Sequence, residues 1–574
     1  MRQTIRRMIA AAGVLLIALS GPVLAAGPAR AASPYSFTRL AKAQPDECFN
    51  GIGQAYPAGP PCASGKPKVN QAYVWGLTQV GTKIWFGTGA NVHCLVSGAT
   101  LAYVRPVAND NWACEFGSSQ AVKNDATIPA YIGDMRAPQV WTYDTVTGAS
   151  VNKSAEIRAK SADDALRLDH TVGLRAAGSF GGVVLFGGPA IGNALTMFAF
   201  DSTTLRYLGS KTFAEYGNIR TFLVADDALY LGVGIGRNGS AGGGVLRWTG
   251  SVASPFDFVN IANLPVQAAD LTVYDGRVAA TSWPTAQAGT ASTLAGLWIS
   301  PKLADGLPGL NPEDADGWKQ VWNVGEYEPD PIIVTTYGGG GLAAADGYVY
   351  WGTMHVPMKA TSVYVSKYPP ADDATAQTQA LNTQRAVSIW RGKDLGQTTQ
   401  KIELLYGEST LPVYNPATAT WSNKSTNHTA LYGKSGFGSM FNNYTWRMIA
   451  MDNKIFVGTM DWSYLVKDVV QATATDEVDK FFKGLLVDTI VLGNNVASQN
   501  DYGGDLWMFP STTAAAQQVN SSGLGNYLNY GVRNMIPDGA GGLYLGMANP
   551  MNRRTSLTDS TPEGGWELIK MTKN

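Results

Sequence analysis

Four arginines recur at nearly the same distance before a glycine that closes a short apolar segment, and the spacing is eleven to thirteen residues. The arginines are Arg175, Arg220, Arg447 and Arg533, and their glycines are Gly187, Gly232, Gly458 and Gly546. A guanidinium carries a permanent charge and planar donors that suit carboxylate, phosphate or sulfate. If the fold brings the four together, the pattern predicts an anion site. The alternative is that each arginine ties neighbouring repeats together through an acid or a backbone carbonyl.

Polar and aromatic residues follow the same apolar segments and form a second candidate set. Its members are Asn91, His93, Trp283, His355, Asp461, Trp462 and Asn549, and His170 precedes the segment of Arg175. Histidine can act as a general base, so His93, His170 and His355, with Asp461 as partner or acid, are the catalytic candidates. Trp283 and Trp462 are candidates for stacking against a sugar. The alternative for each residue is an ordinary hydrogen-bonding or packing role.

The apolar segments themselves predict the scaffold. They cover residues 84–87, 183–187, 229–232, 277–280, 349–352, 455–458 and 543–546. Each follows an extended run and a turn, often Asp-Gly or Asp-Asn, which suits a tight hairpin. A further β-rich run with an aromatic residue comes after each segment. Four antiparallel strands repeated seven times resemble the seven-bladed β-propeller class, and this likeness of architecture assigns no role to any residue.

Closure of such a ring needs one more strand, because the chain ends soon after the third strand of its last unit. Residues 35–40 alternate like a strand, and we expect them to complete the last blade. One all-β domain would then cover residues 32–574. Insertions are expected in blades 1, 5 and 6, at about 94–137, 358–386 and 463–502, with a helix at 476–492 in the last of them.

The first 31 residues have the pattern of a signal peptide, with Arg2, Arg6 and Arg7 before the apolar run 8–19. We therefore expect an exported protein, either periplasmic or secreted, and a monomer. No later segment is long and apolar enough to predict a membrane span. The 43 basic and 44 acidic residues give no general attraction to nucleic acid.

The four cysteines predict disulfides, because an exported protein with an even number of cysteines usually oxidises them. Local pairing, Cys48 with Cys62 and Cys94 with Cys114, is the simplest of three connectivities. A zinc site is the alternative, although the cysteines are widely spaced. No sequence motif for a metal, nucleotide or other cofactor is present, and calcium binding stays open.

Three functions are compatible with these features. The first is an exported protein that binds a polar or anionic ligand, either a small anion or a carbohydrate, at the mouth of the central channel. The second is a lyase or hydrolase that acts on a polysaccharide or another polymer, with a histidine as base and arginines that neutralise a carboxylate. The third is a protein-interaction platform whose inserted loops contact the partner.

Overall fold

The computed structural model describes residues 33–50, 62–92, 127–128, 135–285, 289–303, 309–357, 359–463, 502–552 and 563–574. Several sequence-based predictions lie outside the described residues: the signal peptide 1–31, His93, the Cys94–Cys114 pair, most of the segments 94–137 and 463–502, and the helix expected at 476–492.

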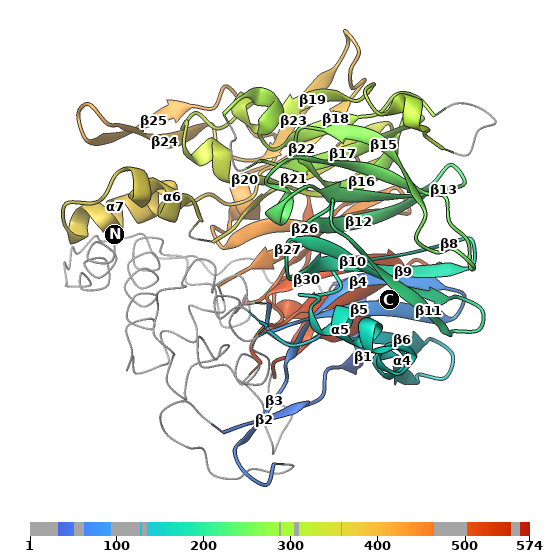
Figure 1. The fold of residues 1–574 in the computed structure, drawn as a ribbon. Coiled ribbons are helices and arrows are strands. Elements are labelled where there is room, and N and C mark those ends of the chain that lie inside the picture. Colours follow the sequence, from blue (N-terminus) through green and yellow to red (C-terminus); the bar gives the residue numbers. More distant parts are fainter. Residues whose placement is uncertain are drawn as a thin grey trace.

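Most of the described chain forms units of four antiparallel strands, which are seen from the side in Figure 1. The first units are β4–β7 (Gln71–Val80, Lys83–Ala90, Val140–Asp144, Ser150–Asn152), β8–β11 (Ala176–Phe180, Val183–Ala190, Ala194–Asp201, Tyr207–Phe213) and β12–β15 (Asn218–Ala225, Ala228–Gly234, Gly243–Trp248, Phe258–Leu264). Next come β16–β19 (Gln267–Tyr274, Arg277–Trp283, Gly296–Ile299, Lys319–Asn323), β20–β23 (Tyr337–Ala345, Tyr348–His355, Ile389–Lys393, Lys401–Tyr406) and β26–β29 (Asn442–Met451, Lys454–Asp461, Leu506–Phe509, Gln517–Asn520). The expectation of repeated four-stranded antiparallel sheets is confirmed.

The remaining unit joins the two ends of the described chain. Strands β30 (Gly531–Pro537), β31 (Leu543–Ala548) and β32 (Glu567–Lys573) pair in sequence order. Strand β1 (Tyr35–Lys42) then pairs antiparallel with β32, from Tyr35 opposite Lys573 to Lys42 opposite Glu567. The segment 35–40, which was expected to be a strand that completes the last unit, therefore pairs with the last strand of the chain.

The second strand of every unit contains one of the apolar segments, and its residues are almost completely buried. Tight turns precede these strands where Asp-Gly or Asp-Asn was found. Asp275 and Asp346 have φ values of 48° and 49°, which a two-residue hairpin turn of this kind requires. The turn at Asp538 is longer, because its carboxylate accepts hydrogen bonds from the backbone N–H groups of Ala540 and Gly542, both at 2.8 Å.

Adjacent sheets pack through aromatic side chains. Trp85 of β5 lies 5.3 Å from Phe200 of β10, and Trp322 of β19 lies 5.1 Å from Trp390 of β22, measured between ring centroids. The first strands of successive units also contact one another in the order β4, β8, β12, β16, β20, β26 and β30, and β30 contacts β4. Each sheet therefore buries its faces against two neighbours.

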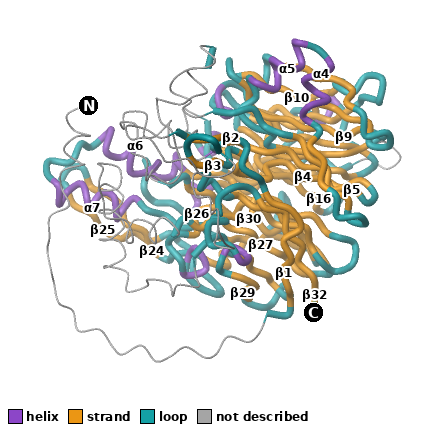
Figure 2. The backbone as a smooth tube through the Cα atoms, turned by 90° about the horizontal axis from the view of Figure 1, so that it is seen from below, coloured by secondary structure: helices purple, strands orange, loops and turns teal. Residues whose placement is uncertain are grey.

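Short elements extend from the sheets. Helices α4 (Ser154–Lys160) and α5 (Ala162–Asp169) follow β7, while α6 (Lys359–Lys367) and α7 (Asp373–Thr383) lie within the segment expected to be an insertion, 358–386. Strands β24 (Thr410–Asn415) and β25 (Thr420–Ser425) form a hairpin, which lies on the same side of the molecule as α6 and α7 in Figures 1 and 2. None of the helices in the described ranges is long and apolar enough to cross a membrane.

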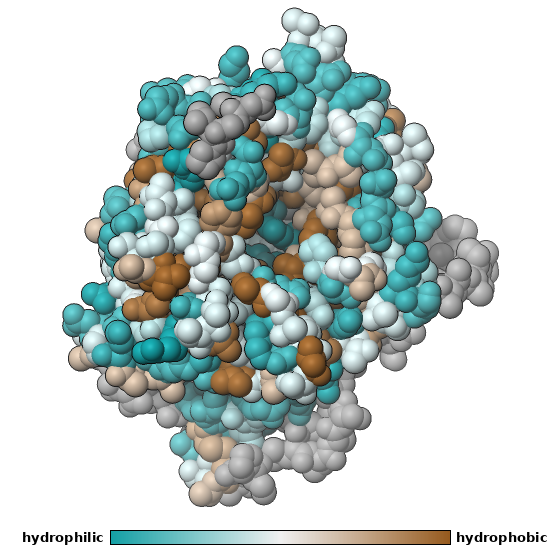
Figure 3. Space-filling view, turned by 90° about the vertical axis from the view of Figure 1, so that its right-hand side faces the viewer, coloured by the Kyte–Doolittle hydropathy of each residue, from teal (hydrophilic) through white to brown (hydrophobic). Residues whose placement is uncertain are grey.

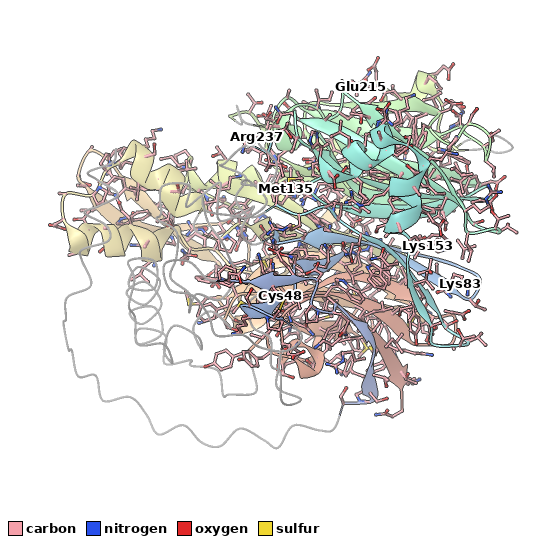
Figure 4. The ribbon with its side chains drawn as sticks, turned by 60° about the horizontal axis from the view of Figure 1, so that its bottom comes forward. Cys48, Lys83, Met135, Lys153, Glu215 and Arg237 are labelled. Carbon is pink, nitrogen blue, oxygen red and sulfur yellow. A yellow bond between two sulfur atoms is a disulfide. The ribbon has the colours of Figure 1, made fainter. Side chains whose placement is uncertain are left out.

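The predicted disulfide between Cys48 and Cys62 is confirmed, with a Cα–Cα distance of 5.7 Å. It lies beside the short hairpin of β2 (Glu47–Phe49) and β3 (Lys66–Lys68), where Figure 4 labels Cys48. The bond ties Cys48 of β2 to Cys62, and a covalent link of this kind stabilises by restricting the unfolded chain.

Tyr35 offers a test of how much β1 contributes to stability. Its ring is buried, lies 5.8 Å from the Phe456 ring of the neighbouring sheet, and its hydroxyl lies 3.6 Å from the Met508 sulfur. Tyr35→Ala should lower the free energy of unfolding by about 3 kcal/mol, the usual cost of removing a buried aromatic side chain. Urea denaturation measures the change, and Ser36→Ala, at an exposed position of the same strand, is the matched control. Equal stability of the two variants would contradict a structural role for β1.

Candidate functional site

The four arginines of the repeated pattern are named the arginine cluster below. They all lie in, or directly before, the first strands of their units. Arg220 is in β12, Arg447 in β26 and Arg533 in β30, and Arg175 directly precedes β8. These strands contact one another through the ring of first strands.

β-Bulges at these strands determine which side chains enter the centre. In β12 the register skips Arg220, and in β30 it skips Arg533. The same irregularity skips Trp75 in β4, Trp446 in β26 and the pair Ala269–Asp270 in β16. A bulged residue is turned away from the ordinary alternation of the strand. The residues that the bulges turn out of the sheets are therefore arginines, tryptophans and an aspartate.

Three members of the arginine cluster lie against tryptophan rings of the neighbouring unit. The guanidinium carbon of Arg220 is 4.1 Å from the ring centroid of Trp283. The corresponding distances are 5.4 Å from Arg175 to Trp75 and 5.8 Å from Arg533 to Trp446. Such cation–π contacts stabilise a charge by roughly 0.5–2 kcal/mol, depending on how far it is desolvated. They leave the charge itself without a counter-ion.

Only one carboxylate in the described part of the chain pairs with the arginine cluster. The Oδ1 atom of Asp270 lies 2.6 Å from Nη1 of Arg447. Asp270 also accepts hydrogen bonds from the Thr221 hydroxyl at 3.0 Å and from the Leu342 N–H at 3.2 Å. Among the described residues, the other three guanidiniums have no ion-pair partner, and the buried Nε atoms of Arg175, Arg447 and Arg533 have no hydrogen-bond partner.

The arginines are close enough to disfavour one another's charge. Burial, together with the positive charges of Arg175 and Arg447, lowers the pKa of Arg533 to about 9. Burial lowers the pKa of Arg175 to about 10, and burial with the charges of Arg175 and Arg533 lowers that of Arg220 well below its usual range. Burial raises the pKa of the nearby Tyr444 to about 12, although Arg220 and Arg175 oppose this rise. An incoming anion would relieve this repulsion.

An apolar collar surrounds the cluster. It contains Ala72, Tyr73, Trp75, Val92, Met354, Trp446, Met460, Trp462, Leu528, Tyr530, Ala548 and Met551, with Trp283 and Tyr444 packed against it. Apolar surroundings strengthen electrostatic interactions by lowering the local dielectric constant. The cluster lies toward α6, because Lys359 of that helix and Arg220 both lie against the Trp283 ring. Figure 3 looks onto the opposite side of the molecule, where it shows a separate view of a hollow near the middle with hydrophilic residues at its floor.

The two candidate asparagines belong to amide networks inside the fold. Asn91 is buried, and its side-chain amide donates to Asn70 Oδ1 at 3.0 Å. Asn549 is also buried and donates to Asn529 Oδ1 at 3.2 Å and to the Glu563 carbonyl at 2.8 Å. These contacts hold the ends of strands and loops together.

The contacts of the described candidate histidines are with residues outside the arginine cluster. His355 is buried, its Nε2 lies 3.1 Å from the Thr353 hydroxyl, and its ring packs edge-on to Tyr337. Burial and the nearby Arg385 charge lower the pKa of His355 to about 3, so the imidazole is neutral at physiological pH and a weak base. His170 ends α5, with its Nε2 3.0 Å from the Thr127 hydroxyl.

The tryptophans proposed for sugar stacking have other contacts on their rings. Trp283 is covered by Arg220, and its indole N–H donates to the Gly339 carbonyl at 2.7 Å. Trp462 is 3% exposed and packs edge-on against Phe441. The arrangement therefore supports anion binding better than stacking against a sugar.

Asp461 is a buried carboxyl group at the end of β27. It accepts hydrogen bonds from the Ser463 N–H at 2.6 Å and from the Ser439 hydroxyl at 3.3 Å. Burial, and then the negative charge of Asp505, raise the pKa of Asp461 to about 8. The group is therefore largely protonated at neutral pH.

Three functional candidates were missed by the sequence reasoning: Trp75, Trp446 and Asp270. Trp75 and Trp446 do carry a signal, because each lies twelve residues before its glycine, exactly as Arg175 and Arg220 do. By its spacing from the glycine, Trp446 and not Arg447 occupies the position in its unit that Arg220 occupies in the unit of β12. Asp270 has no such regular spacing, since the irregularity of β16 includes two residues.

No protein-family model and no curated protein matches the chain. Among solved structures, the β-propeller domain of the trilobed protease from Pyrococcus furiosus is similar at 9% identity, with a TM-score of 0.28, over 78% of this chain and 96% of that one. Acylaminoacyl peptidase from Pyrococcus horikoshii is similar at 8% identity, with a TM-score of 0.30, over 79% and 53% of the two chains. An exo-β-1,3-galactanase from Phanerochaete chrysosporium is similar at 11% identity, with a TM-score of 0.26, over 53% of this chain and 60% of that one.

Asp461 generates a prediction about pH. Its folded pKa lies above the usual value near 4, so its contribution to stability is complete below pH 4 and is lost as the pH rises through about 8. One pKa unit corresponds to about 1.4 kcal/mol, and we expect a loss on the order of 3 kcal/mol between pH 5 and pH 8. Asp461→Asn, which keeps a neutral side chain, should remove this slope in thermal unfolding. Asp452→Asn in the exposed turn of the same hairpin should keep it, and identical slopes in both variants would exclude a protonated Asp461.

Asp270 generates a prediction about charge balance. Asp270→Asn leaves Arg447 without its carboxylate, so we expect the free energy of unfolding to fall by about 3 kcal/mol, as for other broken buried ion pairs. Asp144→Asn breaks the ion pair with Lys83 at the protein edge and should cost less than about 1 kcal/mol. Thermal unfolding in chloride and in sulfate of equal ionic strength is the measurement. Sulfate should raise the melting temperature of Asp270→Asn more than that of Asp144→Asn.

Proposed function

We propose that this chain is an exported protein that binds a polar or anionic ligand at the mouth of a central channel, through the arginine cluster. The observation that carries the proposal is the crowding of Arg175, Arg220 and Arg533 without an ion-pair partner among the described residues. A purely structural role would need counter-charges, since an uncompensated buried charge is destabilising. Arg447 has such a partner in Asp270, and its role is at least partly structural.

We also infer that the four-stranded units are the blades of a closed seven-bladed propeller. The support is the order of contacts among the first strands, which returns from β30 to β4. The pairing of β1 with β32 supports closure by the N-terminal strand. In such a ring the first strands line the channel, which is the position of the arginine cluster.

The described residues give less support to the enzyme and platform alternatives. A lyase or hydrolase needs a base beside the charged site, and His355 is neutral, buried and bonded to Thr353. An interaction platform would be expected to present several apolar side chains on α6 and α7; Tyr364 and Val365 of α6 are buried, and Val363 is the large apolar side chain that α6 exposes. Anion binding requires no further group.

The test uses Arg220→Gln with Arg533→Gln in one protein. The double variant removes two positive charges while keeping side-chain size, so it should weaken the binding of sulfate by at least about a hundredfold, since each lost charged contact costs about tenfold or more. Isothermal titration calorimetry measures the affinity. Arg206→Gln, at an exposed position, is the matched control. Unchanged sulfate affinity in the double variant, with a normal melting temperature, would reject the proposed function.

A further inference from the structure

The charge balance at the centre restricts the kind of anion that fits, if the proposed function holds. Four guanidiniums and the single carboxylate of Asp270 leave an excess of three positive charges among the described residues. Lys359 of α6 adds a further cation at the rim, with its Nζ 5.9 Å from the Trp283 ring that also carries Arg220. A monovalent anion would neutralise a small part of this excess.

The cations also belong to different units. Arg175 and Arg220 belong to the units of β8 and β12, whereas Arg447 and Arg533 belong to those of β26 and β30. Arg533 interacts electrostatically with Arg175 and Arg447, and Arg220 interacts with Arg175 and Arg533. The geometry agrees, because Nη1 of Arg447 in β26 lies 3.3 Å from the hydroxyl of Thr221 in β12, the residue next to Arg220. The first strands of neighbouring units also contact one another, β8 with β12 and β26 with β30. One carboxylate has two oxygen atoms and matches only one guanidinium fork.

The neighbouring groups favour a small ligand with several acceptors. The hydroxyl of Tyr444, beside Arg220 and Arg175, has no hydrogen-bond partner among the described residues. A neutral phenol is a good donor to an anionic oxygen. The tryptophan faces are occupied by guanidiniums, so no free aromatic surface is left in this set for a sugar ring.

Building on the proposed anion-binding function, we propose that the ligand is a compact polyanion with at least two negative charges, of the polycarboxylate or phosphate kind. It bridges Arg175, Arg220 and Arg533 and accepts a hydrogen bond from Tyr444. Lys359 lies at the edge of this site and adds long-range attraction. The aromatic collar holds the guanidiniums in place and excludes bulky uncharged groups.

The experiment compares citrate, inorganic phosphate and acetate by calorimetry on the purified protein, at pH 7.5 and constant ionic strength. We expect citrate or phosphate to bind at least about tenfold more tightly than acetate, because each additional charge pairs with another guanidinium. The ratio of citrate to phosphate affinity identifies which of the two chemistries the site prefers. Acetate that binds as tightly as both polyanions would overturn this inference and leave the proposed function intact.

Variants separate the two levels of the proposal. Arg220→Gln should reduce the affinity for the preferred polyanion by about tenfold and that for acetate by less. Tyr444→Phe removes one hydroxyl without a change of shape, and it should reduce polyanion affinity about threefold; Arg206→Gln should change neither. If none of the three anions binds the unmodified protein, both the inference and the proposed function are wrong. If the polyanion binds equally well to Arg220→Gln and Tyr444→Phe, the inferred site is wrong.

Discussion

The structure depends on the need of each four-stranded sheet to bury both faces against its neighbours. Trp85 of one sheet packs on Phe200 of the next, and Trp322 packs on Trp390. The sheets approach most closely at their first strands. A Cβ atom at Gly76 would lie 2.6 Å from the backbone carbon of Ala176, so only glycine allows this approach. Close packing of the first strands then brings residues together that are hundreds of positions apart in sequence.

This close packing explains why a polar centre forms inside an apolar framework. Side chains on the two faces of a sheet pack against the neighbouring sheets, whereas a bulged residue is turned away from this alternation. In β12 and β30 the bulged residue is arginine, and in β4 and β26 it is tryptophan. In β20 the equivalent pair is Gly340–Gly341, which adds no side chain. The bulge therefore accounts for Arg220 and Arg533, whereas Arg447 pairs in register opposite Gly458 and Arg175 directly precedes β8. Tryptophan rings lie beside three of these arginines.

Polar residues at the starts of the first and third strands have a different task, because they tie the strands of one unit together. Asn529 donates to the carboxylate of Glu567 at 2.7 Å, and Asn442 donates to that of Asp505 at 2.8 Å. Each pair connects the start of a first strand with the start of the third strand in the same unit. A linear reading of the sequence could not separate such internal ties from a ligand-facing rim, because both use asparagine, aspartate and histidine after a strand. The separation depends on which atoms are already hydrogen-bonded in the folded chain.

The sequence by itself determined the repeated four-stranded units and the tight turns at Asp275 and Asp346, and it favoured the Cys48–Cys62 bond among three connectivities, because local patterning and short loops control these features. It also indicated Arg175, Arg220, Arg447 and Arg533, since a repeat places similar positions at similar depths. Only the tertiary structure decided that Asp270 pairs with Arg447, 177 residues away, and that Trp75 and Trp446 lie against Arg175 and Arg533. The physical reason is that a bulge shifts the register of a strand by one or two residues and so changes which side chain points to the centre. The net charge at the centre depends on which of these side chains lie close enough to form an ion pair.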